Sequence, residues 1–183
     1  MTRDNAMQVL TEHTESPNLI KHALAVEAAM RAYAAMLDEN EEVWGVVGLL
    51  HDFDYELYPD LEDHPFRGVE ILKARGWPQE VIDGVLAHAA HTGMVRDTLL
   101  KRAIHAVDEL TGLITACALV QPDKKLASVK VKSVKKKMKD RAFAAAVDRE
   151  SITIGAEEMG LSLDEHIEIV LGAMQQVSDE LGL

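Results

Sequence analysis

The chain has 183 residues, of which 48% are hydrophobic and 27% charged, a composition typical of one folded globular domain and not of a disordered chain. No apolar run is long enough to span a membrane, and the polar N-terminus lacks an apolar stretch of signal-peptide length, so we expect a cytoplasmic protein with no membrane partner. The single cysteine, Cys117, excludes an intrachain disulfide and is expected to be a buried thiol.

Helical spacing of apolar residues runs through most of the chain, while aromatic residues make up only 4% of it. We expect helices near residues 3–13, 17–37, 41–51, 65–76, 78–91, 97–119, 130–147, 149–159 and 164–181, with a loop over 52–63. Ser16 and Asn40 are typical N-caps of the second and third helices, and Pro17 suits a first helical turn. The fold class is therefore predicted to be all-α, in a single domain over residues 1–183.

The net charge of −12 is unevenly distributed along the chain. Residues 124–149 carry ten Lys or Arg and two Asp, against nine basic and 29 acidic residues in the remainder. Such a protein is a poor general binder of nucleic acid, and we expect no nucleic-acid partner. The basic segment could be a solvated helix face, or it could draw a small anionic substrate inward. Under the second interpretation the candidate substrate-binding residues are Lys132, Lys136, Lys139 and Arg149.

Histidines and aspartates form a pattern across separate elements of the chain. His51 and Asp52 end the most apolar predicted helix, where a charged residue is costly unless something pairs with it. Four further residues of the same types lie on other elements, namely His22, His64, His88 and Asp108. Each alone is more often structural, but imidazole and carboxylate together are typical ligands of divalent transition metals. Six of them suffice for two metal ions if one carboxylate bridges.

The order of these residues resembles the six-ligand form of the HD superfamily of metal-dependent phosphohydrolases, over about residues 17–120. The whole chain is also similar to a bacterial group known only as predicted HD hydrolases, through the segments WGVVGLLHDFDYE, DELTGLITA and VKSVKKKMKDRAFAAAVDRE. The resemblance implies an HD-type helical bundle with a metal-binding core, followed by basic and C-terminal helices over 122–183. Whether the last helix packs on the bundle or on a second copy in a homo-oligomer stays open.

The resemblance also implies a role for each residue of the pattern. A first metal would be held by His22, His51, Asp52 and Asp108, and a second by His64 and His88 with Asp52 bridging. The cofactor would be one or two divalent ions per chain, from among Fe, Mn, Co, Ni, Zn and Mg. The reaction implied is attack of metal-bound water or hydroxide on phosphorus, in a small phosphorylated metabolite for which a nucleotide is the first candidate.

One position departs from the family pattern. Many relatives have a Lys or an acid three residues after the motif aspartate, where this chain has Tyr55. The flanking Asp54 and Glu56 are the candidate catalytic residues, either as acid–base groups or as partners that orient a ligand histidine, and ordinary loop acids are the alternative. His91 could be an alternative ligand or a neighbour of the site, although His88 is the favoured ligand. His105 could reach the mouth of the site, but it is interpreted as a surface or packing residue.

Two other functions fit the same ligands. Mixed-valent di-iron oxygenases of the HD superfamily share the six-ligand arrangement, and dependence on dioxygen would distinguish them from hydrolases. A metal-binding regulatory module without catalysis is the other alternative. Against a degenerate site, all six ligand positions are filled.

Overall fold

In a computed structural model, which describes residues 2–183, every regular element is a helix, as the sequence predicts. The α-helices are α1 (Arg3–His13), α2 (Pro17–Leu37), α3 (Glu41–Leu50), α4 (Phe66–Ala74), α5 (Gln79–His88), α6 (Leu99–Leu119), α7 (Val131–Met138), α8 (Arg149–Glu158), α9 (Leu163–Gln176) and α10 (Ser178–Leu181). Two short 3₁₀ helices, η1 (Ala90–Thr92) and η2 (Leu126–Ser128), flank α6 in the sequence. None of these helices is long and apolar enough to cross a bilayer.

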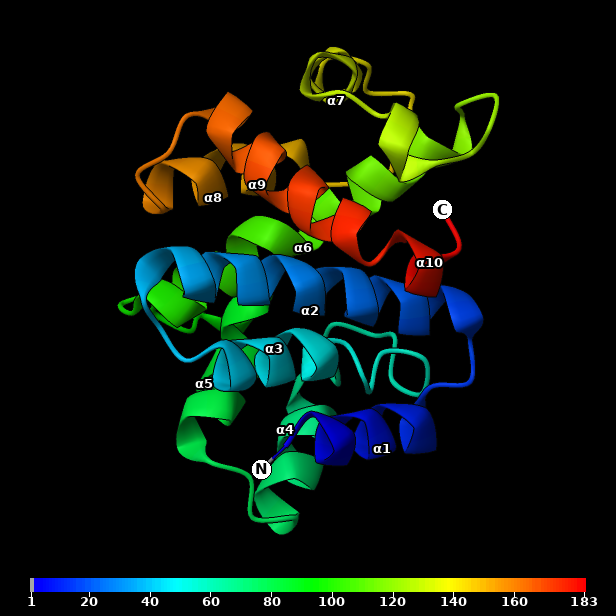
Figure 1. The fold of residues 1–183 in the computed structure, drawn as a ribbon. Coiled ribbons are helices and arrows are strands. Elements are labelled where there is room, and N and C mark those ends of the chain that lie inside the picture. Colours follow the sequence, from blue (N-terminus) through cyan, green and yellow to red (C-terminus); the bar gives the residue numbers. More distant parts are fainter. Residues whose placement is uncertain (1) are drawn as a thin grey trace.

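The two longest helices, α2 and α6, form the centre of the bundle and have 21 residues each. On one side of α2 lie α3, α1, α4 and α5, and on the other side lie α7, α8 and α9 (Figure 1). Helix α2 packs on α3, α6 and α9, while α5 and α8 both pack on α6. The elements that carry the histidine and aspartate pattern, α2, α3, α5 and α6, are therefore neighbours around one core.

Glycines let two helix pairs approach closely. A side chain at Gly48 would place its Cβ 2.8 Å from the backbone N and Cα of Glu27, where α3 crosses α2. A Cβ at Gly155 would lie 2.5 Å from the Cα of Ala106, where α8 crosses α6. The first contact brings the C-terminal end of α3 close to α2, and the second brings the C-terminal half of α8 to α6.

Helices α2 and α3 start where the sequence predicts, but only one of their two predicted N-caps forms side-chain hydrogen bonds. The Asn40 side chain accepts hydrogen bonds from the N–H groups of Glu42 and Val43, and so caps α3. Ser16 precedes α2 but makes no such bond. The backbone N–H groups of Glu15 and Ser16 instead donate to one carboxylate oxygen of Glu56, at 2.8 and 3.0 Å. Glu56, on a distant loop, therefore fixes the two residues that precede α2, while the cap that local sequence suggests for Ser16 is not formed.

The predicted helix over 130–147 is wrong in its second half, because α7 ends at Met138 and the segment after it forms turns. The guanidinium group of Arg149 donates to the backbone carbonyls of Phe143, Ala144 and Val147, which are then not engaged in a helix. Ala144 also has a positive φ of 44°, which a continuous helix does not allow.

Two other predicted helices end earlier than expected. Helix α5 stops at His88, because Ala89 is extended and the chain continues into η1. The C-terminal helix is interrupted at Val177, which separates α9 from α10. Cys117 is buried in α6, as predicted.

Candidate metal centre

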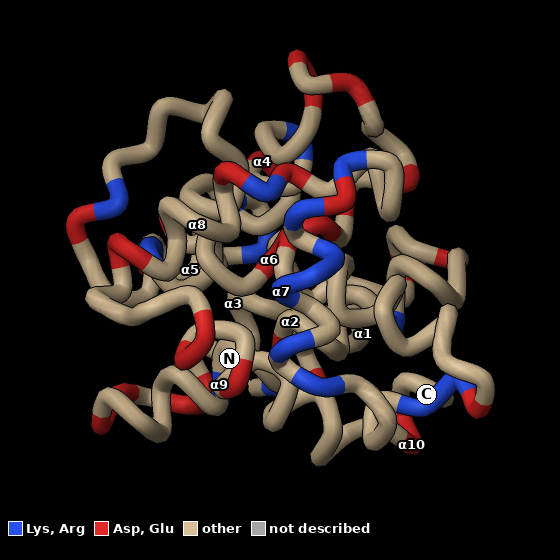
Figure 2. The backbone as a smooth tube through the Cα atoms, turned by 90° about the horizontal axis from the view of Figure 1, so that it is seen from above, with Lys and Arg blue, Asp and Glu red and all other residues tan. Residues whose placement is uncertain are grey.

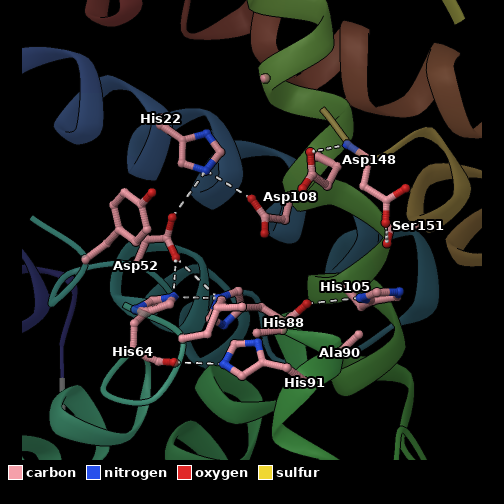
Figure 3. A pocket seen from close by; sticks show the side chains of 15 residues that line it. His22, Asp52, His64, His88, Ala90, His91, His105, Asp108, Asp148 and Ser151 are labelled. Carbon is pink, nitrogen blue, oxygen red and sulfur yellow. Dashed lines mark hydrogen bonds and ion pairs between the residues drawn. The ribbon is translucent and has the colours of Figure 1, made fainter. Parts of the chain in front are cut away.

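The six residues of the histidine and aspartate pattern come together at one cavity, although they lie on five separate segments. Five of them line this cavity of about 560 Å³, namely His22, Asp52, His64, His88 and Asp108 (Figure 3). His51 lies beneath them and is fully buried. The volume falls within the range of small-molecule sites. The fold therefore gathers the candidate ligands at the floor of a pocket that a small molecule can enter.

Three of these residues form a first cluster, which consists of His22, His51 and Asp108. The Asp108 Oδ1 atom lies 3.0 Å from Nε2 of His22 and 3.5 Å from Nε2 of His51. The two Nε2 atoms are 3.2 Å apart. Three potential ligand atoms thus converge from α2, the end of α3 and α6.

The other three residues, Asp52, His64 and His88, form a second cluster. The Asp52 Oδ1 atom lies 3.1 Å from Nε2 of His64 and 3.2 Å from Nε2 of His88. Asp52 also reaches the first cluster, because its other oxygen, Oδ2, lies 3.6 Å from Nε2 of His51 and 4.0 Å from Nε2 of His22. One carboxylate therefore turns an oxygen toward each cluster, as a bridging ligand would.

The second cluster has the donor chemistry that a cation requires. His88 donates its Nδ1 proton to the Val85 carbonyl, and His64 donates its Nδ1 proton to the Asp54 carboxylate at 2.8 Å. In neutral rings the Nε2 atoms then carry lone pairs, and these two atoms face each other at 3.2 Å. Facing lone pairs at this distance need a proton or a metal ion between them.

The first cluster is built in the same way. His51 donates its Nδ1 proton to the Gly48 carbonyl at 2.7 Å, which directs Nε2 toward His22 and Asp108. Such bonds fix the tautomer and the ring orientation of metal-binding histidines. Both clusters therefore fit a divalent transition metal by ligand type and by orientation.

The carboxylates dominate the electrostatics of the floor. Burial alone would lower the pKa of His51, but the charges of Asp52 and Asp108 raise it to about 9. Burial alone would also lower the pKa of His64, but its hydrogen bonds to Asp52 and Asp54 raise it to about 9. Burial would raise the pKa of Asp108, yet the His51 charge and the hydrogen bond to His22 hold it well below its usual range. The site therefore attracts positive charge.

The two candidate catalytic acids are in different places. Asp54 is fully buried and accepts hydrogen bonds from His64 and from the backbone N–H of Gly68, so it orients a candidate ligand. Glu56 holds the start of α2 and does not line the cavity. Tyr55 lies at the mouth with 41% of its surface exposed, and its ring centre is 5.3 Å from that of His64.

The basic candidates lie outside the cavity wall. Lys132 and Lys136 are on α7 and Lys139 follows it, where Figure 2 shows a run of basic residues. Arg149 uses its guanidinium group on the backbone carbonyls of the 140–147 turns. The structure does not bring these four side chains to the cavity, and their part in substrate binding stays a prediction.

Five polar residues in the cavity wall are outside the predicted set of site residues, although the sequence offered His91 as an alternative ligand and His105 as a residue that could reach the mouth. They are His91, His105, Glu109, Asp148 and Ser151. His91 and His105 donate to the backbone carbonyls of His64 and His88, at 2.9 and 3.0 Å. Glu109 could have been predicted as a site residue, because it is next to the candidate ligand Asp108 in the sequence. Asp148 and Ser151 reach the wall only through the packing of α8 on α6, for which the sequence offers no local sign.

Comparison with known proteins agrees with this geometry. The family model described as "HD domain" matches residues 19–113. Two curated relatives, Ribonuclease Y of Acholeplasma laidlawii and of Fusobacterium nucleatum subsp. nucleatum, are each 30% identical to the chain over 95 residues, or 51% of its length. The matched part is 18% of each of those proteins, so the chain corresponds to a small portion of them.

A solved structure resembles nearly the whole chain. The crystal structure of the HD domain of the L. monocytogenes phosphodiesterase PgpH is similar with a TM-score of 0.56 and 16% sequence identity. The similarity covers 97% of this chain and 99% of that one. At this identity the match establishes the fold, including the helices that follow residue 113.

Proposed function

The chain belongs to the HD domain family, and from this premise we propose that it is a metal-dependent phosphohydrolase that acts on a small phosphorylated metabolite. The observation that carries the proposal is the Asp52 carboxylate, which turns one oxygen toward each of two histidine clusters. Nucleotides are the first substrate class to test. The similar HD domain belongs to a phosphodiesterase, which supports hydrolysis of a phosphoester as the reaction type.

The clusters would hold one divalent ion each, with Asp52 shared between them. When bound, such ions lower the pKa of coordinated water and polarise phosphoryl oxygens. The residues of the chain prepare this site in advance. Hydrogen bonds at Nδ1 hold the rings of His51, His64 and His88 with Nε2 toward the cavity, so binding requires no ring rotation. Tyr55 and Leu61 also line the cavity and are exposed to solvent.

A phosphate-release assay tests the proposal. The protein would be stripped of metal, reloaded with Mn²⁺, Mg²⁺, Co²⁺, Zn²⁺ or Fe²⁺, and screened against nucleotides, cyclic nucleotides, sugar phosphates and phosphorylated amino alcohols. We expect release with at least one pairing of metal and substrate, and loss of release in Asp108→Asn. Glu62→Gln is the matched control, because it neutralises an exposed acid on the loop after α3 that does not line the cavity.

The outcomes separate the candidate functions. Release by both variants would place the activity outside this site and contradict the proposal. No release with any metal, together with substrate-dependent oxygen uptake after Fe²⁺ loading, would favour the oxygenase alternative. Neither activity, with metal still bound, would favour a regulatory module.

A further inference from the structure

One wall of the cavity is made of hydrogen-bond acceptors that the metal clusters do not use. Four residues contribute to it, namely His105, Glu109, Asp148 and Ser151. Figure 3 shows His105, Asp148 and Ser151 on the opposite side of the cavity from Asp52 and His64. Within residues 2–183, no Lys or Arg lines the cavity. An anionic group would therefore find no partner on this wall.

His105 is buried and keeps one ring nitrogen free of partners within the described chain. Only 4% of the residue is exposed. Its Nδ1 proton goes to the His88 carbonyl at 3.0 Å, so Nε2 of the neutral ring is an acceptor. The ring lines the cavity, and Nε2 has no hydrogen bond to residues 2–183. Because this acceptor opens onto the cavity, its donor comes from the solvent or from a ligand.

In their ionised forms, the carboxylates beside His105 are also acceptors only. Glu109 Oε2 accepts the Asp148 backbone N–H at 3.0 Å, which leaves its other oxygen without a partner in the described chain. The Asp148 carboxylate accepts the Glu150 backbone N–H and the Ser151 hydroxyl proton, at 2.9 and 2.7 Å. Because the Ser151 proton is used in this bond, its hydroxyl oxygen offers the cavity only lone pairs.

The charged groups of the cavity thus lie in two places, the floor and one wall. At the floor, Asp52 and Asp108 would be balanced by divalent cations, whose excess positive charge would accept a phosphoryl group. At the wall, no Lys or Arg of the lining offsets the carboxylates of Glu109 and Asp148. Burial and the charge of Asp108 raise the pKa of Glu109 to about 7, so a cationic group placed against it would favour its ionised form. A complementary ligand has a negatively charged group that contacts the floor. It also has a positively charged group with several N–H donors that contacts the wall.

We propose that the substrate is a zwitterionic phosphoester, a phosphorylated amino alcohol whose ammonium group is held by Glu109 and His105. This inference rests on the proposed function and narrows its substrate class away from nucleotides. A primary ammonium has three N–H donors, which match in number and kind the free Glu109 oxygen, the His105 Nε2 atom and the lone pairs of the Asp148–Ser151 pair. The cavity of about 560 Å³ accommodates such a molecule.

Calorimetric titration of the metal-loaded protein tests this assignment without relying on turnover. The probes are O-phosphoethanolamine, ethyl phosphate, which lacks the ammonium group, ethanolamine, which lacks the phosphate, and adenosine monophosphate. We expect phosphoethanolamine to bind about tenfold more tightly than ethyl phosphate, as one partly desolvated charge pair allows. Glu109→Gln, whose amide oxygen still accepts the Asp148 N–H, should remove most of that preference. His105→Gln should reduce it independently.

Glu157→Gln is the control, because it removes a similar charge from α8 at an exposed position outside the cavity. It should leave the preference intact. Three results would overturn the ammonium site and leave the hydrolase proposal standing. They are equal binding of phosphoethanolamine and ethyl phosphate by the wild type, a preference for phosphoethanolamine that Glu109→Gln retains, and tightest binding of adenosine monophosphate. Binding of ethanolamine that depends on Glu109, with no binding of any phosphate, would support the ammonium site and contradict the phosphohydrolase.

Discussion

Asp54 and His64 form a buried pair in which His64 Nδ1 donates to the carboxylate at 2.8 Å. The second Asp54 oxygen accepts the backbone N–H of Gly68, also at 2.8 Å, at the start of α4. Both oxygens are therefore used, one on a candidate ligand and one on the helix that follows it. This contact makes the position of the His64 ring depend on a residue that never faces the cavity.

Replacement of Asp54 by Asn should weaken the second cluster selectively. An amide has a single acceptor oxygen, so either His64 Nδ1 or the Gly68 N–H loses its partner and meets an N–H group instead. We expect about 10- to 100-fold lower affinity for one cation and a stability loss of about 1–3 kcal/mol. Chelator competition and urea unfolding measure the two effects. Glu56→Gln is the control for metal binding, and unchanged metal affinity in Asp54→Asn would contradict the role assigned to the pair.

The bridging position of Asp52 predicts a difference in metal content between variants. Asp52→Ala removes an oxygen from both clusters and should lower the affinity for both cations. His22→Ala removes a ligand from the first cluster alone and should leave one cation bound near His64 and His88. Elemental analysis after gel filtration gives the number of ions per chain. If the Asp52→Ala protein kept one cation at full affinity, Asp52 would serve only one cluster.

The candidate ligands could be predicted because they are recognisable by residue type and by their position on the buried face of a helix. His51 and Asp52 end a helix that is apolar on most sides, and His88 and Asp108 lie on regular helices whose buried faces repeat at helical spacing. Local sequence therefore placed these side chains on core-facing surfaces. Tertiary packing then had only to bring those surfaces together.

The parts that could not be predicted depend on contacts between distant segments. The entry into α2 is held by Glu56, 40 residues along the chain from Ser16, and not by a cap at Ser16 itself. The end of α7 depends on Arg149, which takes up the carbonyls of the turns before it. Asp54 lies in a turn without hydrophobic periodicity, so nothing local distinguished its buried role from the peripheral role of Glu56.

The close approach of α8 to α6 predicts opposite effects for two glycine substitutions. A Cβ at Gly155 would lie 2.5 Å from the Cα and 2.7 Å from the Cβ of Ala106, so Gly155→Ala must separate the helices. We expect a stability loss of about 1–3 kcal/mol. Gly172 lies within α9 with no atom within 4 Å of its added Cβ, and Gly172→Ala should stabilise the protein by about 0.5–1 kcal/mol. Urea unfolding measures both, and equal effects would contradict the packing argument.

Away from the metal centre, Tyr33 and His166 form a buried pair between α2 and α9. The Tyr33 hydroxyl lies 2.6 Å from His166 Nδ1, and His166 Nε2 donates to the Ala106 carbonyl at 2.9 Å. The carbonyl fixes the proton on Nε2, so Nδ1 accepts the Tyr33 proton in a neutral ring. Burial lowers the pKa of His166 to about 4.

This shift predicts a loss of stability in mild acid. In the unfolded chain the His166 pKa is about 6.5, so between pH 6.5 and 4 the unfolded state binds more protons than the folded state. The stabilisation is therefore complete above pH 6.5, falls as the pH drops toward 4, and amounts to roughly 3 kcal/mol across that window. His166→Gln keeps one donor and one acceptor without titrating. Urea unfolding at several pH values should show the wild type's advantage over this variant shrinking with acidity, and a constant difference would mean that His166 is not buried in its neutral form.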